Sequence, residues 1–259
     1  MDHNPIAQRI IRRFRIAYIV ISILVCVTMA TVLLLTVADL PEYGKTGNPG
    51  ENEVFHRYLH DGVSETGAVN IVAAIILDYR AFDTLGEAIV LFMALIAVFV
   101  LLGNERSAFE SSDPHHGDYE LAEDQIFQTV AAVIIPCLLL FGLYIIANGH
   151  ISAGGGFAGG AVLGAAMIMY QLAYGLEKTR RFLNSKTFPR YMVGALMLYA
   201  CAKGFSFFTG GNHLDLKIPL GDPGSIFSAG LILPLNAAVG LAVACAIYGL
   251  FTLFYSGEI

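Results

Sequence analysis

The stretch Gly149 to Gly160 reads GHISAGGGFAGG and lies between two long apolar runs. Within it, Gly154, Gly156 and Gly159 fit the pattern G-x-G-x-x-G, which in a soluble βαβ unit holds the pyrophosphate of a dinucleotide. That pattern must follow a β-strand and open a helix, whereas here a run of helix-spanning length stands on each side. The flanking runs argue against a dinucleotide site and favour a tight turn between two membrane spans.

The composition points the same way. Of the 259 residues, 56% are hydrophobic and only 14% are charged, and the mean hydropathy is +0.65. Soluble domains carry about 25% charged residues, and a helix needs about 20 apolar residues to cross a bilayer. We therefore predict an all-α, polytopic integral membrane protein with about six transmembrane helices. The candidate spans are residues 16–37, 81–102, 126–147, 157–176, 191–208 and 226–254.

The basic residues predict the orientation of these spans. One cluster precedes the first span and a second lies between the fourth and fifth, and Lys and Arg favour the cytoplasmic side. Both termini are then cytoplasmic, in the cytoplasmic membrane of a bacterium or archaeon. The connections 38–66 and 212–222 hold few basic residues and belong outside. The orienting residues are Arg9, Arg12, Arg13, Arg15, Lys178, Arg180, Arg181, Lys186 and Arg190.

The apolar stretch 68–78 is too short to cross a bilayer alone. Counting it as a seventh span would also place the basic residues 178–190 outside, against the positive-inside rule. We predict a re-entrant or broken half-helix joined to the next span.

The acidic segment 104–124 is the natural boundary between two parts of the chain. It separates a two-span unit, residues 1–103, from a four-span unit, residues 125–259. We predict that this linker is cytoplasmic. Its adjacent His115 and His116 are interpreted as solvated side chains rather than metal ligands.

Ionisable residues in membrane segments cost several kcal/mol unless they are paired or hydrated, so they mark candidate ion pathways. Asp83 and Glu87 are four residues apart, hence on one helix face, where they can share a proton or bind a transient Na⁺. Alternatively residues 78–83 lie at headgroup depth, where Arg80 simply pairs with Asp83; Glu87 is expected a turn or more deeper. Lys203 either snorkels to the outer surface or faces the protein interior. The candidate ion-pathway residues are Asp78, Arg80, Asp83, Thr84, Glu87 and Lys203.

Small residues four apart let helix backbones approach closely in lipid, and the glycine stretch continues into such a ladder. Gly154 and Gly155 allow the tight turn before it. The candidate helix-packing and subunit-contact residues are His150, Gly154, Gly155, Gly156, Gly159, Gly160 and Gly164.

Two motifs carry a family resemblance. GHISAGGGFAGG resembles the B subunit of Mrp-type multisubunit Na⁺/H⁺ antiporters, which commonly has proline where this chain has Ala153. ETGAVNIVAAIILDYRAFDTLGE, Glu65 to Glu87, resembles the C-terminal extension of the large A subunit and the equivalent small subunit of energy-converting membrane-bound hydrogenases. The resemblance covers residues 10–103 and 120–256, as a fusion of two units that often belong to separate chains.

The resemblance implies a membrane subunit of a sodium-translocating module that lies beside large antiporter-like subunits. It implies that residues 78–87 belong to the sodium-side path and that His150 and the glycine turn shape the subunit contact. The expected partners are those subunits, Na⁺, H⁺ and the lipid bilayer, with no nucleic acid and no cofactor. Two alternatives stay open: the same module attached to a hydrogenase or related reductase, and a purely structural scaffold. The four cysteines stand alone in separate apolar runs, so we expect the chain to have no metal-cluster ligation of its own.

Overall fold

The computed structural model describes residues 5–40, 53–103, 124–175, 178–179, 187–211 and 218–255. These residues form helices and connecting segments, with no β-strand among them. Six of the helices are long and apolar enough to cross a membrane. The prediction of an all-α, polytopic membrane protein is therefore confirmed. The acidic linker with His115 and His116 lies outside the described residues.

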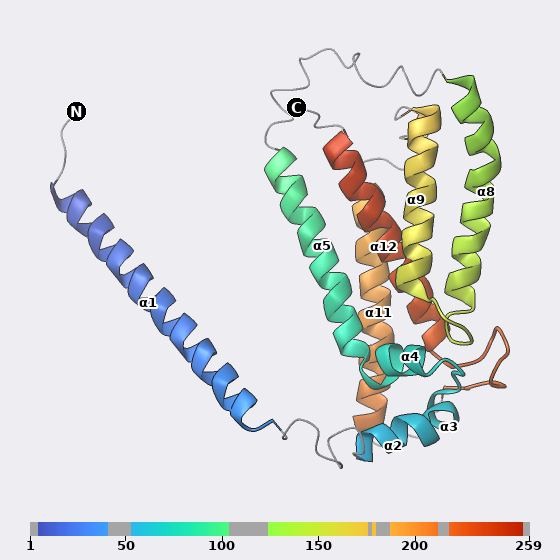
Figure 1. The fold of residues 1–259 in the computed structure, drawn as a ribbon, viewed down its shortest axis with the longest axis horizontal. Helices are drawn as coiled ribbons and strands as arrows, with labels where there is room; N and C mark the ends of the chain where they lie inside the picture. The colour runs from blue at the N-terminus through green and yellow to red at the C-terminus, as the bar shows by residue number, and fades with distance from the viewer. Residues whose placement is uncertain are drawn as a thin grey trace. The chain divides into compact units, whose positions relative to one another are not determined.

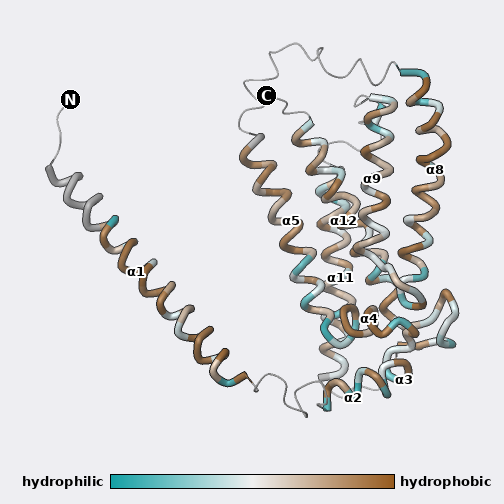
Figure 2. The backbone as a smooth tube through the Cα atoms, in the orientation of Figure 1, coloured by the Kyte–Doolittle hydropathy of each residue, from teal (hydrophilic) through white to brown (hydrophobic). Residues whose placement is uncertain are grey.

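The chain divides into two compact units, and the first, Met1–Phe55, contains one long helix. This helix, α1 (Pro5–Ala38), has 34 residues. Its threonine hydroxyls donate to carbonyls one turn earlier, as Thr28 does to Leu24 O at 2.8 Å, so they carry no unsatisfied donor into an apolar environment. A helix that is apolar on all sides is suited to a lipid environment, and Figure 2 shows the hydrophobic residues along its length.

The second unit, His56–Ile259, holds the other five long helices, which pack side by side (Figure 1). Within its 18-residue apolar window α12 is 67% buried, against 17–39% for its four neighbours, so α12 is the central helix. Alanine and glycine along α12 let those neighbours come close, because small side chains permit short distances between helix axes. The five helices are α5 (Ala81–Gly103), α8 (Gln125–Ala147), α9 (Gly156–Tyr174), α11 (Thr187–Gly211) and α12 (Ile232–Tyr255).

The start of α12 corrects one predicted boundary. The apolar run 226–254 suggested a helix from Ile226, but α12 begins at Ile232. The residues just before it adopt left-handed backbone conformations, with φ of 66° at Ala229 and 54° at Gly230, which an α-helix cannot contain. Hydrophobicity alone does not reveal this irregular entry.

A chain of short helices precedes α5 and lies at one end of the bundle (Figure 1). The segment predicted as a half-helix at 68–78 is a short α-turn, α4, that continues as a π-helical turn, η2. Arg80, with φ −121° and ψ 36°, ends η2 and separates it from α5. The expected short, broken helix is therefore present. These elements are α2 (Glu53–His60), α3 (Gly62–Thr66), α4 (Ile71–Ala74) and η2 (Ile75–Tyr79).

Candidate functional site

The centre of the site is an ion pair between two helices that are far apart in sequence. Lys203 of α11 is only 5% exposed, and its Nζ lies 2.5 Å from Asp78 Oδ1 of η2, 125 positions away. The ammonium therefore faces the interior rather than snorkelling to the surface. A buried ammonium without a counter-ion would cost several kcal/mol, and Asp78 supplies that counter-ion.

Asp78 also borders a polar cleft of about 250 Å³. Three hydroxyl side chains share the cleft wall with its carboxylate: Thr66 from α3, and Ser206 and Thr209 from α11. Thr209 donates to Phe205 O at 3.0 Å, whereas Ser206 Oγ has no hydrogen-bond partner among the described residues. We call this space the Asp78 cleft; the rest of its lining is Gly210, Ile218, Leu220, Ala229, Gly230, Leu231 and Ile232.

The π-helical turn positions Asp78 for this arrangement. Arg80 N donates to Ile75 O at 2.8 Å, the wider spacing that defines a π-turn, and such turns recur at functional sites. The buried Thr84 hydroxyl donates to Ile76 O at 2.5 Å, which anchors η2 to the first turn of α5. The break between η2 and α5 is thus held by specific polar contacts.

The acids of α5 differ from this pair in their exposure. Arg80 and Asp83 form an ion pair at 2.5 Å with exposed side chains, as the interfacial alternative proposed. Glu87 is exposed one turn further along α5, and it has no hydrogen bond or ion pair with any described residue. Asp83 and Glu87 are therefore on the outer surface of α5, whereas Asp78 and Thr84 contact the interior. In the described part of the chain, no three His, Cys, Asp or Glu side chains are grouped so that they could hold a metal ion.

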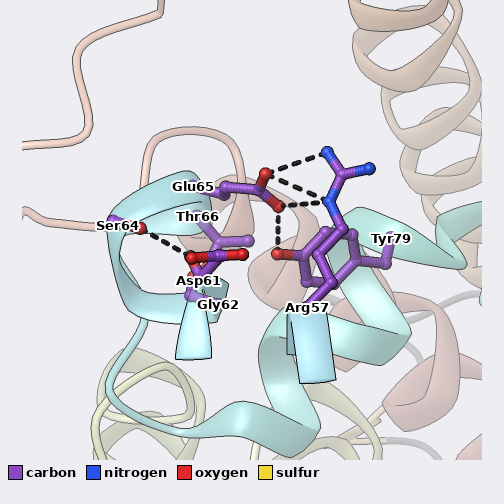
Figure 3. A network of polar contacts seen from close by, with 7 residues as sticks. All are labelled: Arg57, Asp61, Gly62, Ser64, Glu65, Thr66 and Tyr79. Carbon is purple, nitrogen blue, oxygen red and sulfur yellow. Dashed lines mark hydrogen bonds and ion pairs between the residues drawn. The ribbon is translucent and has the colours of Figure 1, made fainter. Parts of the chain in front are cut away.

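Figure 3 shows a second polar network, which sequence reasoning missed, around the Glu65 carboxylate. Arg57 of α2 binds both carboxylate oxygens of Glu65, with its closest contact at 2.8 Å, and Tyr79 OH donates to the same carboxylate. The hydrogen bonds from Arg57 and Tyr79 lower the pKa of Glu65. Burial and the hydrogen bond to Glu65 raise the pKa of Tyr79. The network fixes the residues next to two cleft-lining groups, Thr66 and Asp78.

The glycine turn is connected to the same short helices through Asn70. The Asn70 side chain caps α4 by accepting from Val72 N at 3.1 Å, and it donates to Gly149 O at 2.8 Å and Ser152 O at 2.9 Å. Its backbone N–H donates to His150 O at 2.9 Å. The turn before α9 and the helix that carries Asp78 therefore share one anchoring residue.

His150 holds the turn to a third segment. The imidazole is fully buried, and Nε2 donates to Ser225 O at 3.0 Å in the connection before α12. Nδ1 is buried without a hydrogen-bond partner among the described residues. The motif histidine is thus a link between two loops at the end of the bundle.

The glycine ladder packs against helices of this same chain. A Cβ at Gly156 would lie 2.6 Å from Asn236 O, and one at Gly160 would lie 2.6 Å from Gly240 O, so both face α12. At Gly164 the nearest atom is Ile247 Cβ at 3.0 Å, also on α12. Only glycine permits this separation of α9 and α12.

The remaining motif glycines form the turn before α9 or pack against α8. Gly154 and Gly155 have φ of 136° and 104°, values that side chains rarely allow. A Cβ at Gly159 would lie 2.5 Å from Ile146 Cγ1, which places this residue against α8. The Gly156 amide donates to Asn236 Oδ1 at 2.9 Å and so joins the start of α9 to α12.

Six helices are long and apolar enough to cross a membrane, and the unit that holds five of them contains a buried ion pair. These features define the class: a multi-pass membrane protein with charged groups in its interior. Comparison with known proteins identifies the family. Residues 126–249 match a domain related to the MnhB subunit of Na⁺/H⁺ antiporter, and residues 11–117 match the MbhE subunit of MBH. The chain belongs to the family of antiporter-type membrane subunits that combine these two domains.

Individual relatives agree with this assignment. An uncharacterized protein of Methanocaldococcus jannaschii is 30% identical over 76% of this chain and 78% of its own length. The probable A/B subunit of a K⁺/H⁺ antiporter from Rhizobium meliloti is 27% identical over 58% of this chain, which spans only 17% of that protein. A chain in the structure of the membrane-bound sulfane sulfur reductase, an archaeal respiratory membrane complex, has a TM-score of 0.62 at 27% identity, and the match covers 92% of this chain and 98% of that one.

Proposed function

We propose that this chain is an integral subunit of a multisubunit monovalent cation/proton antiporter, in which it contributes to the sodium-translocation path and to assembly of the complex. The buried Asp78–Lys203 pair at the polar Asp78 cleft carries the proposal. Charges inside a membrane bundle are expensive, and a carboxylate that faces both an ammonium and a polar space suits ion movement. The Na⁺/H⁺ and K⁺/H⁺ antiporter names of its relatives support the same function.

The outer face of α5 indicates contact with a partner subunit. Glu87 is exposed within the apolar window Ala81–Leu101, where direct contact of a carboxylate with lipid would cost several kcal/mol. A neighbouring large antiporter-like subunit that covers this face would remove the cost and bring Asp83 and Glu87 into the ion path. These two acids thus act between subunits, whereas Asp78 and Lys203 act within this chain.

We propose a domain organisation on the same grounds. Residues 1–103 form the unit that resembles the A-subunit extension, residues 104–124 link it, and residues 125–259 form the B-subunit-like unit. The two domain matches, 11–117 and 126–249, support a division of the chain into two units, with the first match extending into the proposed linker. With six spans, both termini lie on the same side, and the basic residues favour the cytoplasmic side of a bacterial or archaeal cytoplasmic membrane.

A redox-driven complex is the second candidate. The match to the sulfane sulfur reductase complex covers nearly all of that chain and favours it. In such a complex this subunit would keep its ion-translocating role. Purification of the intact complex, followed by identification of its subunits and analysis for iron and nickel, separates the two candidates. Metal-free material with only antiporter-type partners favours the antiporter.

Everted membrane vesicles test whether the acids conduct or only support structure. We expect Asp83→Asn and Glu87→Gln to reduce the Na⁺-dependent collapse of a proton gradient at least tenfold. Asp61→Asn makes the same chemical change at an exposed residue outside the spans, and it should leave exchange unchanged. Normal exchange in both acid variants would favour the scaffold and defeat the role of these acids.

A further inference from the structure

The Asp78 cleft has the composition of a cation site. Its described lining includes one residue with a carboxylate and three with hydroxyl side chains, and the polar side-chain atoms of all four are oxygens. Among the residues that the structure describes, Asp78 is the one carboxylate that lines the space, which suits a monovalent ion better than a divalent ion, because divalent ions usually require more anionic ligands. The cleft, with a volume of about 250 Å³, has room for water beside an ion, so an ion can enter partly hydrated.

The Lys203 ammonium is placed to compete with a bound cation for the Asp78 carboxylate. Its Nζ lies 2.5 Å from Asp78 Oδ1, and its side chain is 6% exposed, whereas that of Asp78 is 37% exposed. The carboxylate thus faces the cleft on one side and the ammonium on the other. An ion that binds Asp78 from the cleft must share or replace the ammonium, because one carboxylate has a limited number of lone pairs.

We infer that the Asp78 cleft is a binding site for a partly hydrated Na⁺, and that Lys203 is a built-in competitor whose ammonium leaves Asp78 when the ion arrives. This inference rests on the proposed function and names the site within it. Asp78 is the ion ligand, Ser206 and Thr209 supply neutral oxygen ligands, and Lys203 sets the affinity. Because the ammonium competes for Asp78, Na⁺ binds weakly and reversibly, as an ion path requires.

The neighbouring network keeps the cleft wall in place. Glu65 precedes Thr66 in sequence and Tyr79 follows Asp78, and the two outer residues are hydrogen-bonded to each other. Arg57 fixes Glu65 from the other side with its closest contact at 2.8 Å. Thr66 and Asp78, which line the cleft from α3 and η2, are therefore each next to a residue of this network in sequence.

Equilibrium binding of ²²Na⁺ to the purified intact complex tests the inference, with N-methylglucamine chloride keeping ionic strength constant. We expect Asp78→Asn to remove one bound Na⁺ per complex. Lys203→Met should lower the Kd of that site at least tenfold, because the competing ammonium is gone. Lys203→Arg keeps the competing charge and should stay near the wild-type Kd. Unchanged stoichiometry in Asp78→Asn, or an unchanged Kd in Lys203→Met, overturns the inference.

Ser206→Ala provides a variant that leaves the ion pair intact. Ser206 Oγ has no hydrogen-bond partner among the described residues, so its removal should not disturb folding. We expect the Kd to rise about three- to tenfold, and an unchanged Kd counts against the site. This variant keeps the inference testable if Asp78→Asn does not assemble.

Exchange activity measured on the same preparations distinguishes this inference from the proposed function. A wild-type complex that exchanges Na⁺ for H⁺ while its binding does not depend on Asp78 rejects the cleft site and leaves the function. A wild-type complex that binds Na⁺ through Asp78 but shows no exchange rejects the function and leaves the site.

Discussion

Replacing Gly160 with alanine should separate α9 from α12. The added Cβ would lie 2.6 Å from Gly240 O, whereas an ordinary contact begins at 3.4 Å, so the helices must move apart by about 0.8 Å locally. A gap of 0.5–1 Å already loses roughly a quarter to a half of each dispersion contact beside it. Overpacking of this kind costs about 1–3 kcal/mol. Gly160→Leu should be more severe and should prevent recovery of the intact complex.

Gly194→Ala is the matched control, because it adds the same methyl group inside another span, where nothing lies within 4 Å. Both substitutions gain the same helix propensity, up to about 1 kcal/mol, so that gain cancels when the two are compared. The midpoint of SDS-induced unfolding of the purified chain, followed by circular dichroism, measures the difference. Equal midpoints for the two variants, or normal subunit stoichiometry with Gly160→Leu, would show that the ladder is not a close packing surface.

Three further predictions concern the polar contacts. Asp78→Asn leaves the buried Lys203 ammonium without a counter-ion and should destabilise the protein by about 3–5 kcal/mol. Adding Lys203→Met should restore most of the lost stability. If unfolding experiments show that the two substitutions lower the free energy of unfolding additively, the two side chains are not energetically coupled. Asn70→Ala removes a helix cap and two side-chain hydrogen bonds to the glycine turn, which should lower stability by about 2–3 kcal/mol. Amide hydrogen exchange at residues 149–152 should therefore accelerate. Unchanged exchange rates would show that Asn70 does not hold the turn. Because the folded-state pKa of Glu65 is lowered, its contribution to stability is present above the ordinary value of 4.5 and is lost as pH falls below it. Glu65→Gln should therefore flatten the acid limb of a plot of melting temperature against pH, and an unchanged limb would rule out the network as its source.

The sequence predicts the spans because the bilayer imposes a length and an apolar character that can be read locally. It also predicts the short helix at 68–78, since the ten residues from Ala68 to Leu77 are too few to cross a hydrocarbon core. The four-residue spacing of Gly156, Gly160 and Gly164 predicts a packing face, because spacing determines which side chains share a helix surface. The spacing does not say which helix is the neighbour, and the structure shows that it is α12 of the same chain.

The site itself was only partly predictable. Asp78 and Lys203 each stand out as charges near or within apolar segments, but their contact joins residues 125 positions apart and depends on how α11 packs against η2. Asn70 gave no signal, because an asparagine before a helix is an ordinary cap and its two bonds to the glycine turn arise only in the folded bundle. Asp83 and Glu87 are both exposed, whereas Lys203, the partner of Asp78, is buried, and the spacing of the two acids does not reveal this difference.

Coupled transport in proteoliposomes tests whether this chain carries the ion. The intact complex is reconstituted, a proton gradient is imposed, and ²²Na⁺ uptake is measured for the wild type and for Asp78→Asn, with Asp61→Asn as the control. We predict gradient-driven Na⁺ uptake in the wild type and the control, and a loss of at least tenfold in Asp78→Asn at equal complex content. Wild-type rates of Na⁺ uptake in Asp78→Asn would contradict the assignment of the ion path to the Asp78–Lys203 pair.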